Sequence, residues 1–147
     1  MKALDTNVLV RLLLADDATQ LAQVKRLLSQ PQQFTSPITV MLELVWVLEA
    51  HGYSVAQVQH GLGLLLSLPN FKPAHLAELQ LALEWYGKGM DFADALHLAL
   101  RGASSQLLTF DKAFVKLGKK QGLNTRGVDW VAGVAGVAQL PSRSISK

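Results

Sequence analysis

The sequence contains no cysteine, which excludes disulfide bonds, zinc–thiolate sites and a thiol nucleophile and is compatible with a reducing compartment. No apolar run approaches the ~20 residues that a membrane-spanning helix needs. Asp5 and Arg11 interrupt the apolar region in which a signal peptide would lie. We therefore expect a protein with no membrane segment, and its 147 residues suit one domain with a proper core.

Acidic residues are also scarce, since 11 Asp and Glu stand against 14 Lys and Arg, for a net charge of +3. This charge permits a polyanionic partner without requiring one. The cations gather near the C-terminal end, where five fall within fifteen residues: Lys112, Lys116, Lys119, Lys120 and Arg126. Such a cluster is either a solvated helix face or a patch for phosphate groups.

Apolar periodicity and turn residues predict short strands that alternate with longer helices. The strands are expected at residues 2–5, 34–35, 71–73, 106–110 and 125–128, and the helices at 7–14, 19–28, 38–50, 54–68, 75–86, 91–102 and 111–122. This alternation indicates an α/β fold with parallel strands. We expect one domain over residues 1–128 and an atypical, partly disordered tail over 129–147, with a small-residue run and a Ser/Arg/Lys end.

Two aspartates stand directly after predicted strands and before predicted helices. Asp5 follows the first strand, and Asp111 follows the strand that ends at Phe110. Each could simply cap the helix that it precedes. In open α/β sheets, however, chemistry sits beyond the carboxyl ends of the strands, and parallel pairing would place both aspartates at one edge.

Three further acids stand in or at apolar helices. Glu43 is the only charged residue between Ile38 and Leu48. An isolated carboxylate there is costly unless it is paired, binds a metal or reaches solvent at a seam. Asp91 is a good N-cap, and Asp94 resembles the second half of a capping box. Two carboxylates one turn apart also suit a divalent cation, and oxygen ligands without cysteine favour magnesium or manganese over zinc.

Four segments in this order resemble the motifs of the PIN-domain ribonucleases, and most of all the VapC toxins of bacterial VapBC toxin–antitoxin pairs. They are residues 4–11, 39–43, 91–96 and 108–111, and the similarity runs from residue 1 to about 128. The resemblance implies a three-layer α/β/α sandwich with a parallel sheet of four or five strands and helices on both faces. It also implies a homodimer, a VapB-like antitoxin that obstructs the acidic site, and a cytoplasmic bacterial protein.

Carried onto this sequence, the resemblance assigns roles to a small set of residues. The core acids correspond to Asp5, Glu43, Asp94 and Asp111, with Asp91 as an accessory member. Thr6 and Thr109 would be small polar supports beside them.

The sequence contains three tryptophans, which are expected in the core or at an interface: Trp46, Trp85 and Trp130.

These assignments predict an endoribonuclease that depends on Mg²⁺ or Mn²⁺. Asp5, Asp94 and Asp111 would hold the ion, and Glu43 would complete the site or orient the attacking water. By resemblance, the RNA products would carry 5′-phosphate and 3′-hydroxyl ends. The candidate phosphate contacts are Lys112, Lys116, Lys119, Lys120 and Arg126.

Two other functions are compatible with the same acids. An aspartyl-phosphate phosphotransferase would use Asp5 as its nucleophile. The common signature of such enzymes has a second aspartate two residues later, and this sequence has Asn7 there. A metal-free, non-catalytic protein-binding module would instead use its acids to hold a basic partner.

Overall fold

The computed structural model describes residues 1–102, 104–128 and 141. Within them the chain is mostly helical, and every helix begins and ends within a few residues of the predicted bounds. The helices are α1 (Thr6–Leu14), α2 (Ala18–Leu28), α3 (Ile38–Ala50), α4 (Val55–Leu66), α5 (Leu76–Gly87), α6 (Phe92–Leu100) and α7 (Lys112–Lys120). The strands are β1 (Lys2–Ala3), β2 (Phe34–Thr35), β3 (Leu107–Thr109) and β4 (Thr125–Gly127).

The strands pair in parallel, as predicted, but they form two small sheets. β1 pairs with β2 and β3 pairs with β4, so that Lys2 lies opposite Phe34 and Leu107 opposite Thr125. The strand expected at residues 71–73 contributes a single parallel bridge between Phe71 and Phe34. The single four- or five-stranded sheet of a three-layer sandwich is therefore not formed by the described residues. Strands of two or three residues offer few ladder hydrogen bonds, so helix packing dominates this arrangement.

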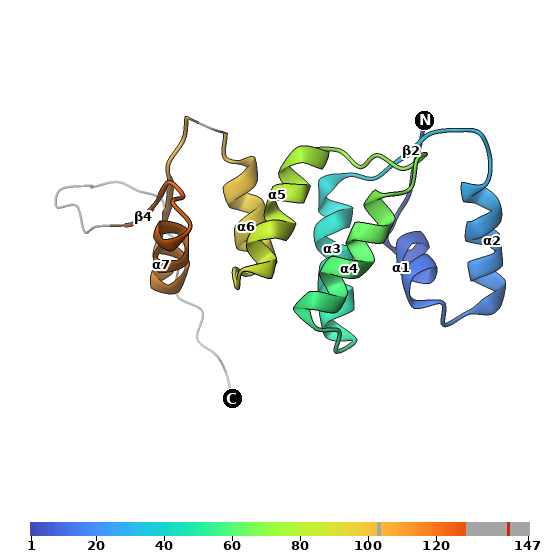
Figure 1. Ribbon diagram of the computed structural model, residues 1–147, viewed down its shortest axis with the longest axis horizontal. Coiled ribbons are helices and arrows are strands. Elements are labelled where there is room, and N and C mark those ends of the chain that lie inside the picture. The colour runs from blue at the N-terminus through green and yellow to red at the C-terminus, as the bar shows by residue number, and fades with distance from the viewer. Residues whose placement is uncertain (103, 129–140, 142–147) are drawn as a thin grey trace.

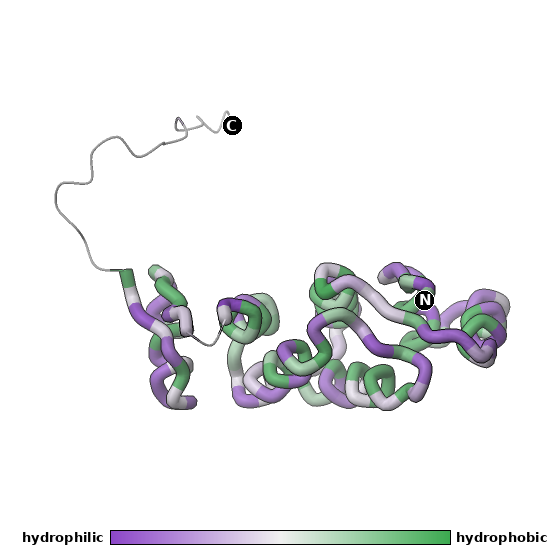
Figure 2. The backbone as a smooth tube through the Cα atoms, turned by 90° about the horizontal axis from the view of Figure 1, so that it is seen from above, coloured by the Kyte–Doolittle hydropathy of each residue, from purple (hydrophilic) through white to green (hydrophobic). Residues whose placement is uncertain are grey.

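The elements follow one another along an extended arrangement (Figure 1). α1 and α2 lie at one end, α3 to α6 form the middle, and α7 with β3 and β4 lies at the other end. The view from above gives the same order (Figure 2). The two sheets consequently stand at different ends of the helical layer.

Helix α3 is central to the apolar core because it packs against α1, α4 and α6. Its Met41 and Leu44 are fully buried together with Leu9 of α1 and Leu98 of α6. The side chain of Phe114 in α7 is also buried and belongs to the same apolar cluster. One apolar core therefore includes side chains from α1, α3, α6 and α7, although the strands form two separate sheets.

The predicted tail over residues 129–147 lies outside the described residues, apart from Pro141. Among the residues that the structure describes, no helix is both long and apolar enough to cross a bilayer.

Two helical glycines have opposite surroundings, and this difference tests the packing of α7 on β4. A Cβ added at Gly118 would overlap the side chain of Thr125, whose Cγ2 would lie only 2.7 Å away. We expect Gly118→Ala to lower the free energy of unfolding by about 1–3 kcal/mol through overpacking. Chemical denaturation measures this change directly.

Gly63 in α4 is the matched control, because a Cβ there would meet no atom within 4 Å. Alanine is the better helix former, so Gly63→Ala should raise the free energy of unfolding by about 0.5–1 kcal/mol. A Gly118→Ala protein as stable as Gly63→Ala would contradict the described contact between α7 and β4.

Candidate functional site

Asp5 is held in place by the junction between β2 and α3. The Leu4 amide donates to the carbonyl of Thr35 at 2.8 Å, and the buried Ser36 hydroxyl donates to the carbonyl of Leu4 at 2.7 Å. The backbone of Leu4, immediately before Asp5, is thus held through both its amide and its carbonyl group. The exposed Asp5 carboxylate then accepts from the Thr6 amide at 2.8 Å and caps α1.

Thr6 links the start of α1 to α3. Its side chain is buried, and its hydroxyl donates to Oε1 of Glu43, 37 residues further along the chain. Glu43 itself is exposed. The carboxylate therefore reaches solvent at a seam between two helices, which is one of the alternatives that the sequence leaves open. This contact brings Asp5 and Glu43 into one group, which we call the α1–α3 group (Asp5, Thr6 and Glu43).

Asp91 and Asp94 lie together at the start of α6. The Asp91 carboxylate caps the helix and accepts from the Asp94 amide at 3.1 Å. Burial raises the pKa of Asp94, and the negative charges of Asp91 and Asp111 raise it further, while His97 opposes this shift. Asp94 therefore lies within electrostatic reach of both other aspartates.

Asp111 caps α7 in the same way. Its carboxylate accepts from the Phe114 amide at 3.0 Å, and its own amide donates to Oγ1 of Thr109 at 3.1 Å. The structure thus places Thr109 directly beside Asp111. We call Asp91, Asp94 and Asp111 the α6–α7 group.

The structure brings the candidate acids together as two groups rather than one. No hydrogen bond or ion pair between described residues joins the α1–α3 group to the α6–α7 group. Among the residues that the structure describes, no three Asp, Glu or His side chains lie close enough to share a metal ion. Carboxylate oxygens are suitable ligands for Mg²⁺ or Mn²⁺, but their present placement does not fit one ion held by all four core acids.

The predicted cations lie directly after Asp111, on α7 and β4. Arg126 of β4 is exposed, and so are four lysines of α7: Lys112, Lys116, Lys119 and Lys120. Helix α7 thus begins directly after one of the α6–α7 acids, Asp111, and carries four of the exposed cations.

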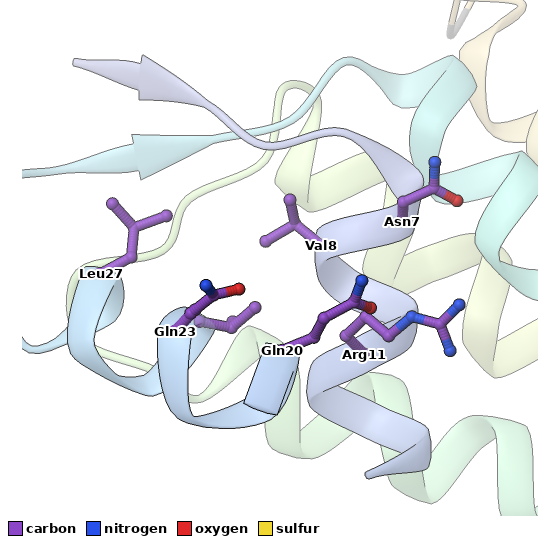
Figure 3. A pocket seen from close by; sticks show the side chains of 7 residues that line it. Asn7, Val8, Arg11, Gln20, Gln23 and Leu27 are labelled. Atoms are coloured by element: carbon purple, nitrogen blue, oxygen red, sulfur yellow. The ribbon is translucent and has the colours of Figure 1, made fainter. Parts of the chain in front are cut away.

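A hollow of about 310 Å³ lies elsewhere, between α1 and α2. Val8 and Arg11 of α1 lie on one side of it, and Gln20, Gln23 and Leu27 of α2 lie on the other (Figure 3). Arg11 at its edge is paired with Asp16 at 2.7 Å. No candidate acid lines this hollow, so it is not part of the acidic site.

The tryptophans are expected in the core or at an interface, and the structure tests the first of these alternatives. Trp85 is buried, as expected, and Trp130 lies outside the described residues. Trp46, however, is 75% exposed, and Phe110 is 82% exposed. Trp46 is therefore not a core residue, and the interface alternative stays a prediction. Sequence reasoning did not single out Phe110, which immediately precedes Asp111.

The raised pKa of Asp94 predicts a pH-dependent stability. Because the folded state holds the Asp94 proton more tightly than the unfolded state, stability falls as pH rises through the window between the two pKa values. Asp94→Asn lacks this loss and should unfold at a higher temperature than the parent at pH 7. Thermal melts at a series of pH values measure the difference, which should shrink as the solution becomes acidic. A variant that is less stable than the parent at pH 7 would be inconsistent with this electrostatic crowding.

Comparison with known proteins places the chain in a family. A family model described as the PIN domain matches residues 2–120. No curated protein matches the chain. Among solved structures, the VapBC2 complex from Rickettsia felis bound to a DNA fragment from its promoter contains a similar chain. That chain is 16% identical, the match covers 87% of this chain and 98% of the other, and the TM-score is 0.38. The matched residues include every candidate acid, in agreement with the sequence resemblance, and the chain belongs to the PIN-domain family.

Proposed function

We propose that this protein is a metal-dependent endoribonuclease of the VapC type, the toxin of a toxin–antitoxin pair. The observation that carries the proposal is the family match over residues 2–120, which spans Asp5, Glu43, Asp94 and Asp111. PIN domains are in general nucleases that use divalent metal ions. Three of these acids stand at or beside helix N-termini, where the helix dipole favours negative charge.

In this proposal Asp5, Asp94 and Asp111 hold Mg²⁺ or Mn²⁺, Glu43 completes the site or orients water, and Asp91 is accessory. The ion would supply an acidified water for hydrolysis and positive charge at the cleaved phosphodiester. Thr6 supports the site through its bond to Glu43, and Thr109 through its bond to the Asp111 amide.

The proposal requires the α1–α3 and α6–α7 groups to approach each other. Joining the two small parallel sheets into the single sheet of a three-layer sandwich would place Asp5 and Asp111 at the same edge, because parallel strands present their carboxyl ends together.

The proposed substrate is RNA, with 5′-phosphate and 3′-hydroxyl product ends. Its phosphates would contact the exposed cations of α7 and β4. As in the VapC family, we propose a homodimer in the bacterial cytoplasm, inhibited by a VapB-like antitoxin that covers the acids with its own cation.

Asp5→Asn tests the nuclease assignment, because asparagine caps a helix as well as aspartate but is a poorer metal ligand. We expect cleavage of total RNA in Mn²⁺ or Mg²⁺ to fall about 100-fold or more. Sequencing of the product ends gives the rate and the cleavage sites together.

Asp17→Asn is the matched control, since Asp17 caps α2 through a 2.9 Å bond from the Gln20 amide and lies in neither acidic group. It should cleave RNA like the parent. If folded Asp5→Asn cleaves as fast as Asp17→Asn, Asp5 is not part of the site. If the parent neither cleaves RNA nor binds Mn²⁺ in titration calorimetry, the metal-free binding module replaces the nuclease.

A further inference from the structure

Tyr86, in the last turn of α5, has its ring in the core and its hydroxyl bonded to another helix. The residue is only 4% exposed, and its hydroxyl donates to Oε1 of Glu49 at 2.9 Å. Glu49 is exposed and lies in the last turn of α3, 37 residues earlier in the chain. This hydrogen bond therefore ties the end of α5 to the end of α3.

The ring of Tyr86 also packs against the first residue of α6. The rings of Tyr86 and Phe92 meet edge to face, with centroids 5.6 Å apart and planes at 80°. Phe92 is almost completely buried, so its ring cannot leave this contact without opening the core. Because Phe92 directly follows Asp91 and stands two residues before Asp94, its position sets where both aspartates lie.

The backbone of α5 holds the turn that leads to these aspartates. The Gly89 amide donates to the carbonyl of Tyr86 at 3.1 Å, and the Met90 amide donates to the carbonyl of Trp85 at 3.2 Å. Gly89 has a φ of +104°, a conformation that favours glycine. Since Asp91 follows Met90 at once, this turn couples the end of α5 closely to the start of α6.

Tyr86, Glu49 and Asp91 also border one hollow of about 490 Å³. Burial raises the pKa of Tyr86, and the hydrogen bond to Glu49 and the negative charges of Glu49 and Asp91 raise it further. The phenol therefore stays protonated at neutral pH and remains a donor to Glu49. All of these contacts join α3, α5 and α6, so they involve neither sheet and do not depend on how the two sheets approach each other.

We propose that Tyr86 and Glu49 are positioning residues, whose hydrogen bond holds the start of α6 and thereby places Asp91 and Asp94. This inference rests on the proposed nuclease function for its effect on RNA cleavage, whereas the positioning itself is measured without metal. Catalytic groups must be held within about 0.5 Å of their productive positions by the residues around them. A bond that fixes the first turn of α6 therefore acts on the reaction through its aspartates.

The first measurement is amide hydrogen exchange of the metal-free protein. Tyr86→Phe removes the hydroxyl but keeps the ring that packs on Phe92, so the variant should fold. The amides of Asp94 and Ala95 bond to the carboxylate and the carbonyl of Asp91, respectively. We expect these two amides to exchange about 10-fold faster than in the parent, because the first turn of α6 opens more often.

Variants of Glu49 test the other side of the same bond. Glu49→Ala removes the acceptor and should speed exchange as much as Tyr86→Phe does. Glu49→Gln keeps an oxygen that accepts, although a weaker one, so exchange should stay within about 3-fold of the parent. A double variant that combines Tyr86→Phe with Glu49→Ala should exchange no faster than either single variant, because all three lose one shared bond.

Gln59→Ala is the matched control. The Gln59 amide of α4 donates to the carbonyl of Leu83 in α5 at 2.8 Å, so this variant also loses a hydrogen bond between α5 and a neighbouring helix. It should lower the melting temperature but leave the exchange of the Asp94 and Ala95 amides at the parental rate. Equal acceleration by Gln59→Ala and Tyr86→Phe would show a merely structural role and overturn the proposal.

The second measurement is RNA cleavage at saturating Mn²⁺. We expect kcat to fall about 10-fold in Tyr86→Phe and to be retained in Glu49→Gln. KM for RNA should not change, because the cations that we propose for RNA binding lie on α7 and β4. An unchanged kcat in Tyr86→Phe, or a change in KM alone, would overturn the positioning role.

The two proposals fail in different ways. A parent protein that cleaves no RNA, while Tyr86→Phe still speeds exchange at the start of α6, would retain the positioning and lose the nuclease. A parent that cleaves RNA, with exchange and kcat unaltered in Tyr86→Phe, would retain the nuclease and lose the positioning.

Discussion

The arrangement of this protein depends on one recurring interaction, in which an aspartate carboxylate accepts a hydrogen bond from the first turn of the helix that it precedes. Asp5, Asp91 and Asp111 each do so, at 2.8, 3.1 and 3.0 Å. The positive end of the helix dipole makes negative charge favourable at these places. A cap uses one carboxylate oxygen, so the other remains available to a ligand. The structural role that each aspartate has and the chemical role that we propose for it are therefore compatible.

These caps also explain which parts of the structure were predictable. A capping aspartate and the apolar period after it are local signals, so the starts of α1, α2, α6 and α7 followed from a few neighbouring residues. The pairing of strands two or three residues long is not local, and the sequence suggested one sheet where the described residues form two. The same limit applies to the site. The aspartates and their caps were predictable, but the hydrogen bond from Thr6 to Glu43 joins residues 37 apart and followed from no spacing.

Exposure on α3 was equally difficult to predict. This helix is apolar around most of its circumference, so its sequence does not reveal which side faces the core. Trp46 is consequently expected in the core or at an interface, and its exposure excludes the core. Large aromatic residues on an all-apolar helix are informative only after the neighbouring helices are placed. Here that placement leaves only the second of the two alternatives, the interface, as a prediction for Trp46.

The central claim is that carboxylates from both ends of the chain share one divalent cation. Mn²⁺ is paramagnetic and broadens the amide resonances of residues near it, so titration of isotope-labelled protein locates the bound ion. We expect the first equivalent of Mn²⁺ to broaden the amides of Asp5, Thr6, Asp94 and Asp111 together. Broadening confined to only one of the two groups, or spread over the surface without saturation, would contradict a shared site.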